Sequence, residues 1–104
     1  MAEETSSDSS SQYRLPSATT LQHVVKISIT EDKPIMLDYW TGSLDNQVLI
    51  GMRESGEKLL VKSEDEYTSP ISKIYKVEGD FIILTENSIY LISSEVETKR
   101  ISGS

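Results

Sequence analysis

Short apolar runs alternate with polar turns along most of the chain, at a spacing typical of β-strands. In residues 22–29, Val25, Ile27 and Ile29 alternate with polar side chains. Alternation with a period of two is typical of a half-buried strand. β-branched side chains, which dominate this run, also favour strands. We therefore predict that residues 22–29 form the first strand.

Six further runs have the same character and are bounded by turn residues. They cover residues 34–41, 47–53, 58–63, 69–77, 81–85 and 88–92. Gly56 lies in a short polar loop between two runs and predicts a hairpin there, because glycine adopts positive φ without steric cost. No run shows the 3.6-residue period of a helix-length segment. Strands joined by short turns favour antiparallel pairing, because parallel pairs need long crossovers. The predicted fold is all-β: a small antiparallel meander of about seven strands that forms a barrel or a compact sandwich.

The two ends of the chain are polar. Residues 1–20 are rich in serine, threonine and acidic residues and bury too little to offset the entropy of ordering. We therefore expect a disordered acidic tail over residues 1–20, a β-domain over residues 21–93 and a flexible tail over residues 94–104. Val96 and Ile101 leave open a short final strand or helical turn.

Several predicted strands are apolar on both faces, most clearly in residues 81–84 and 89–92. A sheet with one face in water alternates more cleanly. Either the strands close on themselves within the chain or the outer face is an interface. A domain of this size buries little surface by itself. The pattern therefore predicts self-association or a protein partner.

Charge and composition narrow the class of partner. The formal net charge is −7, of which −5 falls in residues 21–92. An acidic domain lacks the lysine and arginine stripe that binds a phosphate backbone or an anionic membrane, so neither nucleic acid nor membrane is expected as a direct partner. The chain has no cysteine, no basic and apolar leader and no run long enough to cross a bilayer. We expect an intracellular, soluble protein of the cytoplasm or nucleus.

No catalytic, cofactor or metal motif emerges. The single histidine, His23, lies in the first predicted strand and has no nucleophile motif near it in the sequence. The glycines lack phosphate-loop spacing, and Gly51, inside a strand, indicates a bulge or a close approach of another backbone. Glu64, Asp65 and Glu66 form a dense acidic loop, but consecutive side chains point apart, so we interpret it as acidic surface rather than a metal site. The chain is expected to be no enzyme and to need no cofactor.

Aromatic residues are the best binding candidates. Trp40 and Met36 share one face of the second predicted strand, opposite Ile35, Leu37 and Tyr39. Tryptophan and methionine are frequent contact residues at interfaces, although a closed or bent sheet would bury Trp40 instead. Tyr67 and Tyr90 lie beside loops rich in hydroxyl groups and are the other two candidates.

The run from Thr68 to Ile71, together with residues 77–92, resembles the terminal hairpin of small phage and bacterial β-domains, a resemblance that carries no functional motif. The leading hypothesis is a non-catalytic protein-interaction, regulatory or structural module that uses an exposed apolar β-face or strand edge. One alternative is a small-molecule or nucleotide-binding, sequestering β-barrel of phage or viral type. A weaker alternative is an acidic mimic of nucleic acid.

Overall fold

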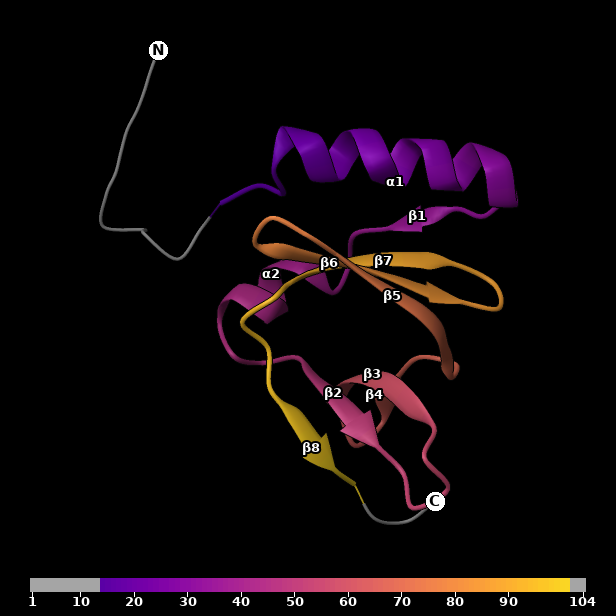
Figure 1. Cartoon of the computed structure of the whole chain (residues 1–104). Coiled ribbons are helices and arrows are strands. Elements are labelled where there is room, and N and C mark those ends of the chain that lie inside the picture. The colour runs from indigo at the N-terminus through magenta and orange to yellow at the C-terminus, as the bar shows by residue number, and fades with distance from the viewer. Residues whose placement is uncertain (1–13, 102–104) are drawn as a thin grey trace.

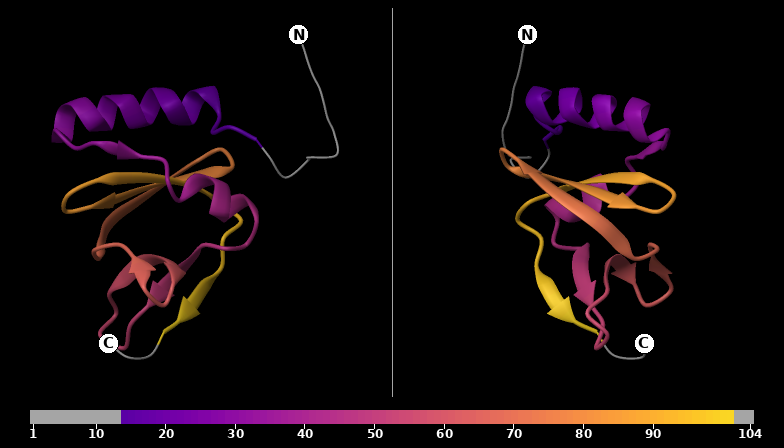
Figure 2. Two further views of the ribbon diagram at one scale, coloured as in Figure 1. Left: turned by 180° about the vertical axis from the view of Figure 1, so that it is seen from behind. Right: turned by 45° about the vertical axis from the view of Figure 1, so that its right-hand side comes forward.

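The computed structural model describes residues 14–101, which form three layers (Figure 1). A helix covers one face of a four-stranded sheet, and a second four-stranded sheet lies on the opposite side (Figure 2). In chain order the elements are α1 (Ala18–Glu31), β1 (Ile35–Met36), α2 (Trp40–Leu44), β2 (Leu49–Met52), β3 (Lys58–Ser63), β4 (Glu66–Tyr67), β5 (Ile71–Val77), β6 (Asp80–Thr85), β7 (Ile89–Ser93) and β8 (Thr98–Arg100). Strands therefore dominate, as predicted.

The two sheets are both mixed. Sheet A has the order β1-β7-β6-β5, and sheet B has the order β4-β3-β2-β8. Consecutive strands pair antiparallel in β5-β6-β7 and in β2-β3-β4, as the short turns predicted. The prediction of a purely antiparallel meander is wrong at two pairs, because β1 lies parallel to β7 and β8 lies parallel to β2. A closed barrel is also wrong: each sheet keeps two edges.

The first predicted strand is wrong, because residues 22–29 lie in α1. Ser17 caps the helix by accepting a hydrogen bond from the backbone N–H of Thr20 at 3.0 Å. Thr20 and Val24 are buried, and Ile27 packs against the apolar cluster that Val24 forms with residues of sheet A. These positions repeat with the helical period, and their burial against sheet A outweighs the weak helix propensity of β-branched residues.

The second predicted strand, residues 34–41, is mostly wrong as well. Only Ile35 and Met36 pair in β1, and α2 begins at Trp40. Tyr39 and Trp40 are adjacent, yet Trp40 packs in the cluster beneath α1 and Tyr39 in the cluster between the sheets. Tyr39 directly precedes the short helix and Trp40 begins it, so this corner of the chain supplies one side chain to each cluster.

The remaining boundaries shift at the chain ends. The described chain begins at Arg14 and is helical from Ala18, inside the segment predicted as a disordered tail. Residues 98–100 form β8, so of the two possibilities left open by Val96 and Ile101 the short final strand is the one observed. The prediction of disorder for residues 1–13 lies outside the described residues.

Sheet A is the middle layer, and this explains its apolar strands. Ile82 and Leu91 belong to the cluster beneath α1, whereas Ile83 and Ile92 belong to the cluster between the sheets. Because side chains alternate along a strand, β6 and β7 supply both clusters. Their apolar residues are therefore covered within the chain and do not require a partner.

A buried carboxylate ties the start of α1 to sheet A. Asp80, at the first position of β6, is fully buried. Its oxygens accept hydrogen bonds from Arg14 Nη1 at 2.8 Å, from the Ser17 backbone N–H at 3.0 Å and from Thr20 Oγ1 at 2.8 Å. We call these contacts the Asp80 network. They satisfy the carboxylate and set the position of the helix N-terminus.

Candidate functional site

Trp40 is a core residue in this fold and not an exposed contact residue. Its side chain is 6% exposed. The indole Nε1 donates to the Arg14 carbonyl oxygen at 2.8 Å, and the Arg14 guanidinium lies 5.1 Å from the ring centroid. Met36, its predicted companion, is half-buried in β1. The short helix at Trp40 removes the strand face that the two residues were predicted to share.

The two tyrosine candidates lie in different sheets. Tyr90 is half-buried in β7 and packs edge-on against Tyr39, with ring centroids 5.4 Å apart. Burial, together with the charge of Asp38, raises the pKa of Tyr90. Burial, followed by the charge of Glu66, raises the pKa of Tyr39 to about 12. Tyr67 is 53% exposed on β4, the edge strand of sheet B.

The acidic loop is exposed at the turn between β3 and β4. Glu66 Oε2 lies 3.4 Å from Lys62 Nζ, while Glu64 and Asp65 point into solvent. Within residues 14–101, no group of three or more histidine or acidic residues is arranged to hold a metal ion. His23 is exposed on α1, away from the predicted strand.

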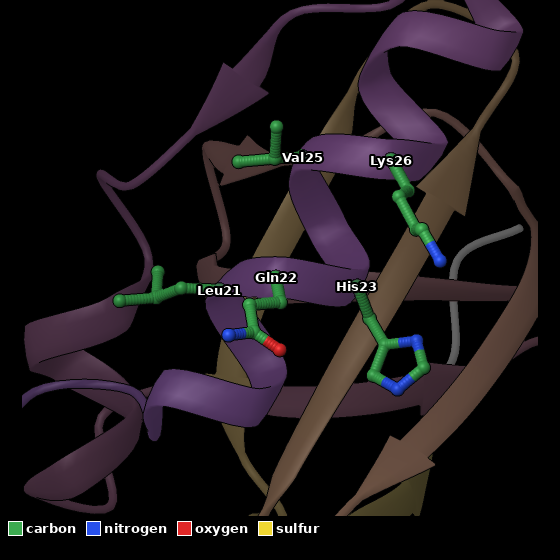
Figure 3. Close-up of a pocket in the computed structure, with 5 residues that line it drawn as sticks. All are labelled: Leu21, Gln22, His23, Val25 and Lys26. Atoms are coloured by element: carbon green, nitrogen blue, oxygen red, sulfur yellow. The ribbon is translucent and has the colours of Figure 1, made fainter.

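Helix α1 carries an apolar stripe that sheet A does not cover. Leu21, Val25 and Ile29 are 40%, 48% and 76% exposed. Their four-residue spacing places them on one side of the helix. We call these three residues the α1 apolar flank. Figure 3 shows Leu21 and Val25 pointing to one side of α1, away from His23 and Lys26 on the other side. A shallow depression of about 540 Å³ is formed at this surface by Leu21, Gln22, His23, Val25 and Lys26.

Sequence reasoning missed this surface because it assigned α1 to a strand. In an alternating strand, Val25, Ile27 and Ile29 share a face; in the helix, Ile27 turns toward sheet A and the other two stay outside. A signal was present in the cap residue Ser17, followed by apolar residues at helical spacing from Leu21 onward.

The second exposed surface is the outer face of sheet B. Ile50 and Leu60 point into the core, so Leu49, Leu59 and Val61 point to the opposite face. A hollow of about 870 Å³ lies there. Its lining residues are Asn46, Gln47, Leu49, Arg53, Leu59, Val61, Lys62, Ser63, Glu64, Tyr67, Arg100 and Ile101. We call this surface the sheet B hollow.

The floor of the hollow is closely packed at Gly51. Ile101 packs on Gly51, where an added Cβ would lie 3.0 Å from both Ile101 Cδ1 and Ile101 Cγ2. The pairing of β2 with β3 and β8 runs through Gly51 without a register shift. The bulge predicted at Gly51 is wrong, and the groups that approach Gly51 closely are the side chains of Ile101 and Val61 rather than another backbone.

The sheet B hollow is cationic in an acidic chain. Three of its lining residues are Arg53, Lys62 and Arg100, against a single carboxylate, Glu64. Arg53 Nη1 lies 3.1 Å from Glu57 Oε1, but Arg53 Nε is buried and donates to no acceptor among residues 14–101. The excess of cations over carboxylates among the lining residues favours an anionic group in this hollow.

The long edge of sheet A offers a third surface of a different kind. β5 pairs only with β6, and residues 72–76 are exposed. Lys73 and Lys76 lie on this edge, and the register shifts between Ile71 and Lys73. Lysines and bulges on an edge strand oppose pairing with another strand. β5 is therefore poorly suited to strand addition.

No protein-family model, curated protein or solved structure matches this chain. Within the described residues, no helix is long and apolar enough to cross a membrane. The surfaces are therefore interpreted from their own residues.

Proposed function

We propose that this chain is a non-catalytic protein-interaction module that docks through the α1 apolar flank into an apolar groove of a partner protein. One observation carries the proposal: three large apolar side chains stay exposed at four-residue spacing on a helix whose other side is already packed. Such spacing is the pattern of anchors by which a helix binds in a groove.

The flank is also preorganised for docking. Helix α1 satisfies its own backbone hydrogen bonds, and Ser17 and Asp80 hold its N-terminus against sheet A. A partner therefore meets a folded helix, and little entropy is lost in ordering the flank. Ile29, the most exposed of the three, is the side chain with most apolar area to bury.

This proposal moves the interaction surface from a β-face or strand edge to a helix. Both faces of β6 and β7 are covered within the chain, and the exposed edge strand β5 carries Lys73 and Lys76. The sheet B hollow is cationic and suits an anionic ligand better than an apolar partner surface. Of the exposed surfaces in residues 14–101, the α1 apolar flank best fits an apolar groove.

The test replaces flank residues by aspartate and measures both partner binding and self-association. Val25→Asp/Ile29→Asp removes two anchors, and His23→Asp places an aspartate on the other exposed side of α1. Partners captured from host extract by the wild type are purified, and their affinity is measured by titration. The flank variant should weaken binding by about tenfold or more, as expected when anchor residues are lost, while His23→Asp should bind as wild type.

Circular dichroism must show both variants folded, which is expected because the changed residues are exposed. Sedimentation of the same proteins detects docking on a second copy, which is the competing outcome. Equal partner affinities for the wild type and the flank variant would refute the proposal. So would self-association that only the flank variant loses, since the occupant would then be a second copy of the chain.

A further inference from the structure

The sheet B hollow combines an apolar floor with three cations. Leu49, Leu59 and Val61 line it from β2 and β3, and Arg53, Lys62 and Arg100 are the cations that line it. Arg53 Nη1 lies 3.1 Å from Glu57 Oε1, so this cation is partly compensated within the chain. Carboxylate groups are the side-chain partners that match a guanidinium, because they accept its N–H groups at short distance.

The other two cations of the hollow have little compensation. Lys62 Nζ lies 3.4 Å from Glu66 Oε2, with Glu66 itself mostly exposed. Arg100 makes no ion pair within the described part of the chain, whereas its neighbour Lys99 pairs with Glu97 at 3.4 Å. The hollow therefore favours an occupant that brings several carboxylates and no cation.

We propose that the occupant is the acidic N-terminal segment of the same chain, residues 1–13. This segment contains Glu3, Glu4 and Asp8 and neither lysine nor arginine. The number of carboxylates in the segment, three, equals the number of cations that line the hollow. Charge complementarity thus singles out residues 1–13 as the occupant.

The length of the segment is sufficient to reach the hollow from Arg14. Arg14, the residue that follows it, accepts the hydrogen bond from Trp40 Nε1 through its carbonyl oxygen at 2.8 Å. Trp40 begins α2, and the chain then leads to Asn46 and Gln47 at the hollow. The six residues from Trp40 to Asn46 span at most about 20 Å, whereas thirteen extended residues span about 43 Å. Residues 1–13 are long enough to follow α2 and enter the hollow.

Covalent attachment makes the contact effective although each ion pair is weak. An exposed ion pair contributes little by itself. A tethered segment, however, has an effective concentration on the order of millimolar at a site within its reach. A separate acidic ligand would therefore compete with residues 1–13 for the hollow. This inference concerns a different surface from the α1 apolar flank and does not depend on it.

Paramagnetic relaxation in the full chain tests the contact. Because the protein contains no cysteine, Ser6→Cys provides a single thiol for a nitroxide label between Glu4 and Asp8. If the segment is docked about half of the time or more, amide signals of Leu49 and Val61 should lose intensity by a factor of about two or more. Signals from residues 26–31 of α1 serve as the internal reference.

Two charge variants and a matched control assign the effect. Neutralising the segment by Glu3→Gln, Glu4→Gln and Asp8→Asn should restore the signals, as should Arg100→Gln. Lys99→Gln, which removes a cation outside the hollow, should leave the broadening unchanged. Raising the ionic strength from about 0.1 to about 1 M should also restore the signals, because the Debye length falls from about 10 to about 3 Å.

Three results would overturn the proposal. The first is the absence of broadening at the hollow in the labelled full chain. The second is broadening that persists when the three carboxylates are neutralised. The third is broadening that disappears when labelled protein is diluted with unlabelled protein, since the segment would then dock on a second copy. Folding of each variant is checked by the dispersion of the same spectra, so an unfolded variant is recognised and replaced by the salt titration.

Discussion

Asp80 is the residue whose replacement tests the three-layer fold most directly. It is fully buried and accepts hydrogen bonds from Arg14, Ser17 and Thr20, all at or before the first turn of α1. Asp80→Ala removes every acceptor of this network at once. Asp80→Asn keeps the shape and one acceptor oxygen but loses the charge.

The size of the effect follows from the three contacts. A hydrogen bond to a charged group contributes about 1.5–3 kcal/mol when its donor is left buried. The Ser17 N–H loses its acceptor outright, whereas Thr20 Oγ1 retains the Val77 carbonyl oxygen at 3.3 Å. Arg14 is 41% exposed, so water replaces the carboxylate and that ion pair contributes about 1 kcal/mol or less. We expect Asp80→Ala to lower the free energy of unfolding by about 3 kcal/mol and Asp80→Asn by about 1–2 kcal/mol.

Urea unfolding followed by circular dichroism and by the fluorescence of Trp40 measures both losses. Trp40 is the only tryptophan and contacts Arg14, so its emission reports the junction of α1 with the sheet. Glu86→Gln, which removes an exposed carboxylate in the turn after β6, is the control and should change stability by less than about 0.5 kcal/mol. If Asp80→Ala behaves like Glu86→Gln, the Asp80 network does not hold α1 and the reasoning fails.

Two further predictions concern sheet B and the core between the sheets. Gly51→Ala should lower the free energy of unfolding by about 1–2 kcal/mol, because the new Cβ would lie 3.0 Å from the Ile101 and Val61 side chains. Gly79→Ala, whose new Cβ has its nearest contact at 3.7 Å, is the control. Equal chemical-denaturation midpoints for the two variants would contradict the close packing at Gly51. Because the pKa of Tyr39 is raised to about 12, the fold favours the neutral phenol; its contribution is fully present below pH 10 and is lost as pH rises through 12. The stability of the wild type relative to Tyr39→Phe should therefore fall from pH 10 to pH 12 in urea titrations, and a constant difference would refute it.

The two exposed surfaces lie on opposite outer layers of the molecule. The α1 apolar flank belongs to the layer on one side of sheet A, and the sheet B hollow belongs to the outer face of the layer on the other side (Figures 1 and 2). One is apolar and the other cationic. Occupation of one surface therefore leaves the other accessible, and the two proposals can be tested separately.

Local sequence predicted the strands of the two hairpin regions well. β3 has the predicted bounds, β6 begins one residue before the prediction, and β7 is shifted by one residue at both ends. The turn at Gly56 has φ of 97° and joins β2 to β3, as predicted. These features depend on alternation and turn chemistry between neighbours in the sequence, so they are readable without the fold.

Residues 22–29 show where local reading failed. Alternation of Val25, Ile27 and Ile29 is compatible with a strand, and within residues 22–29 only Val24, directly before Val25, breaks the alternation. The helix forms because Ser17 caps its N-terminus and because one of its faces is buried against sheet A. Neither feature is visible in a window of eight residues. The same error concealed the α1 apolar flank. At residues 34–41, a second wrong strand led to the prediction that Trp40 is exposed, whereas Trp40 is buried.

The sequence by itself determined a strand-rich chain, its hairpins, its acidic balance and the two-sided apolar character of residues 81–84 and 89–92. It left open whether a partner, a closed barrel or the chain itself covers those residues. Only the tertiary structure decided this, by placing sheet A between α1 and sheet B. The physical reason is that alternation tells which side chains share a face, whereas the layer that covers each face comes from segments distant in the sequence.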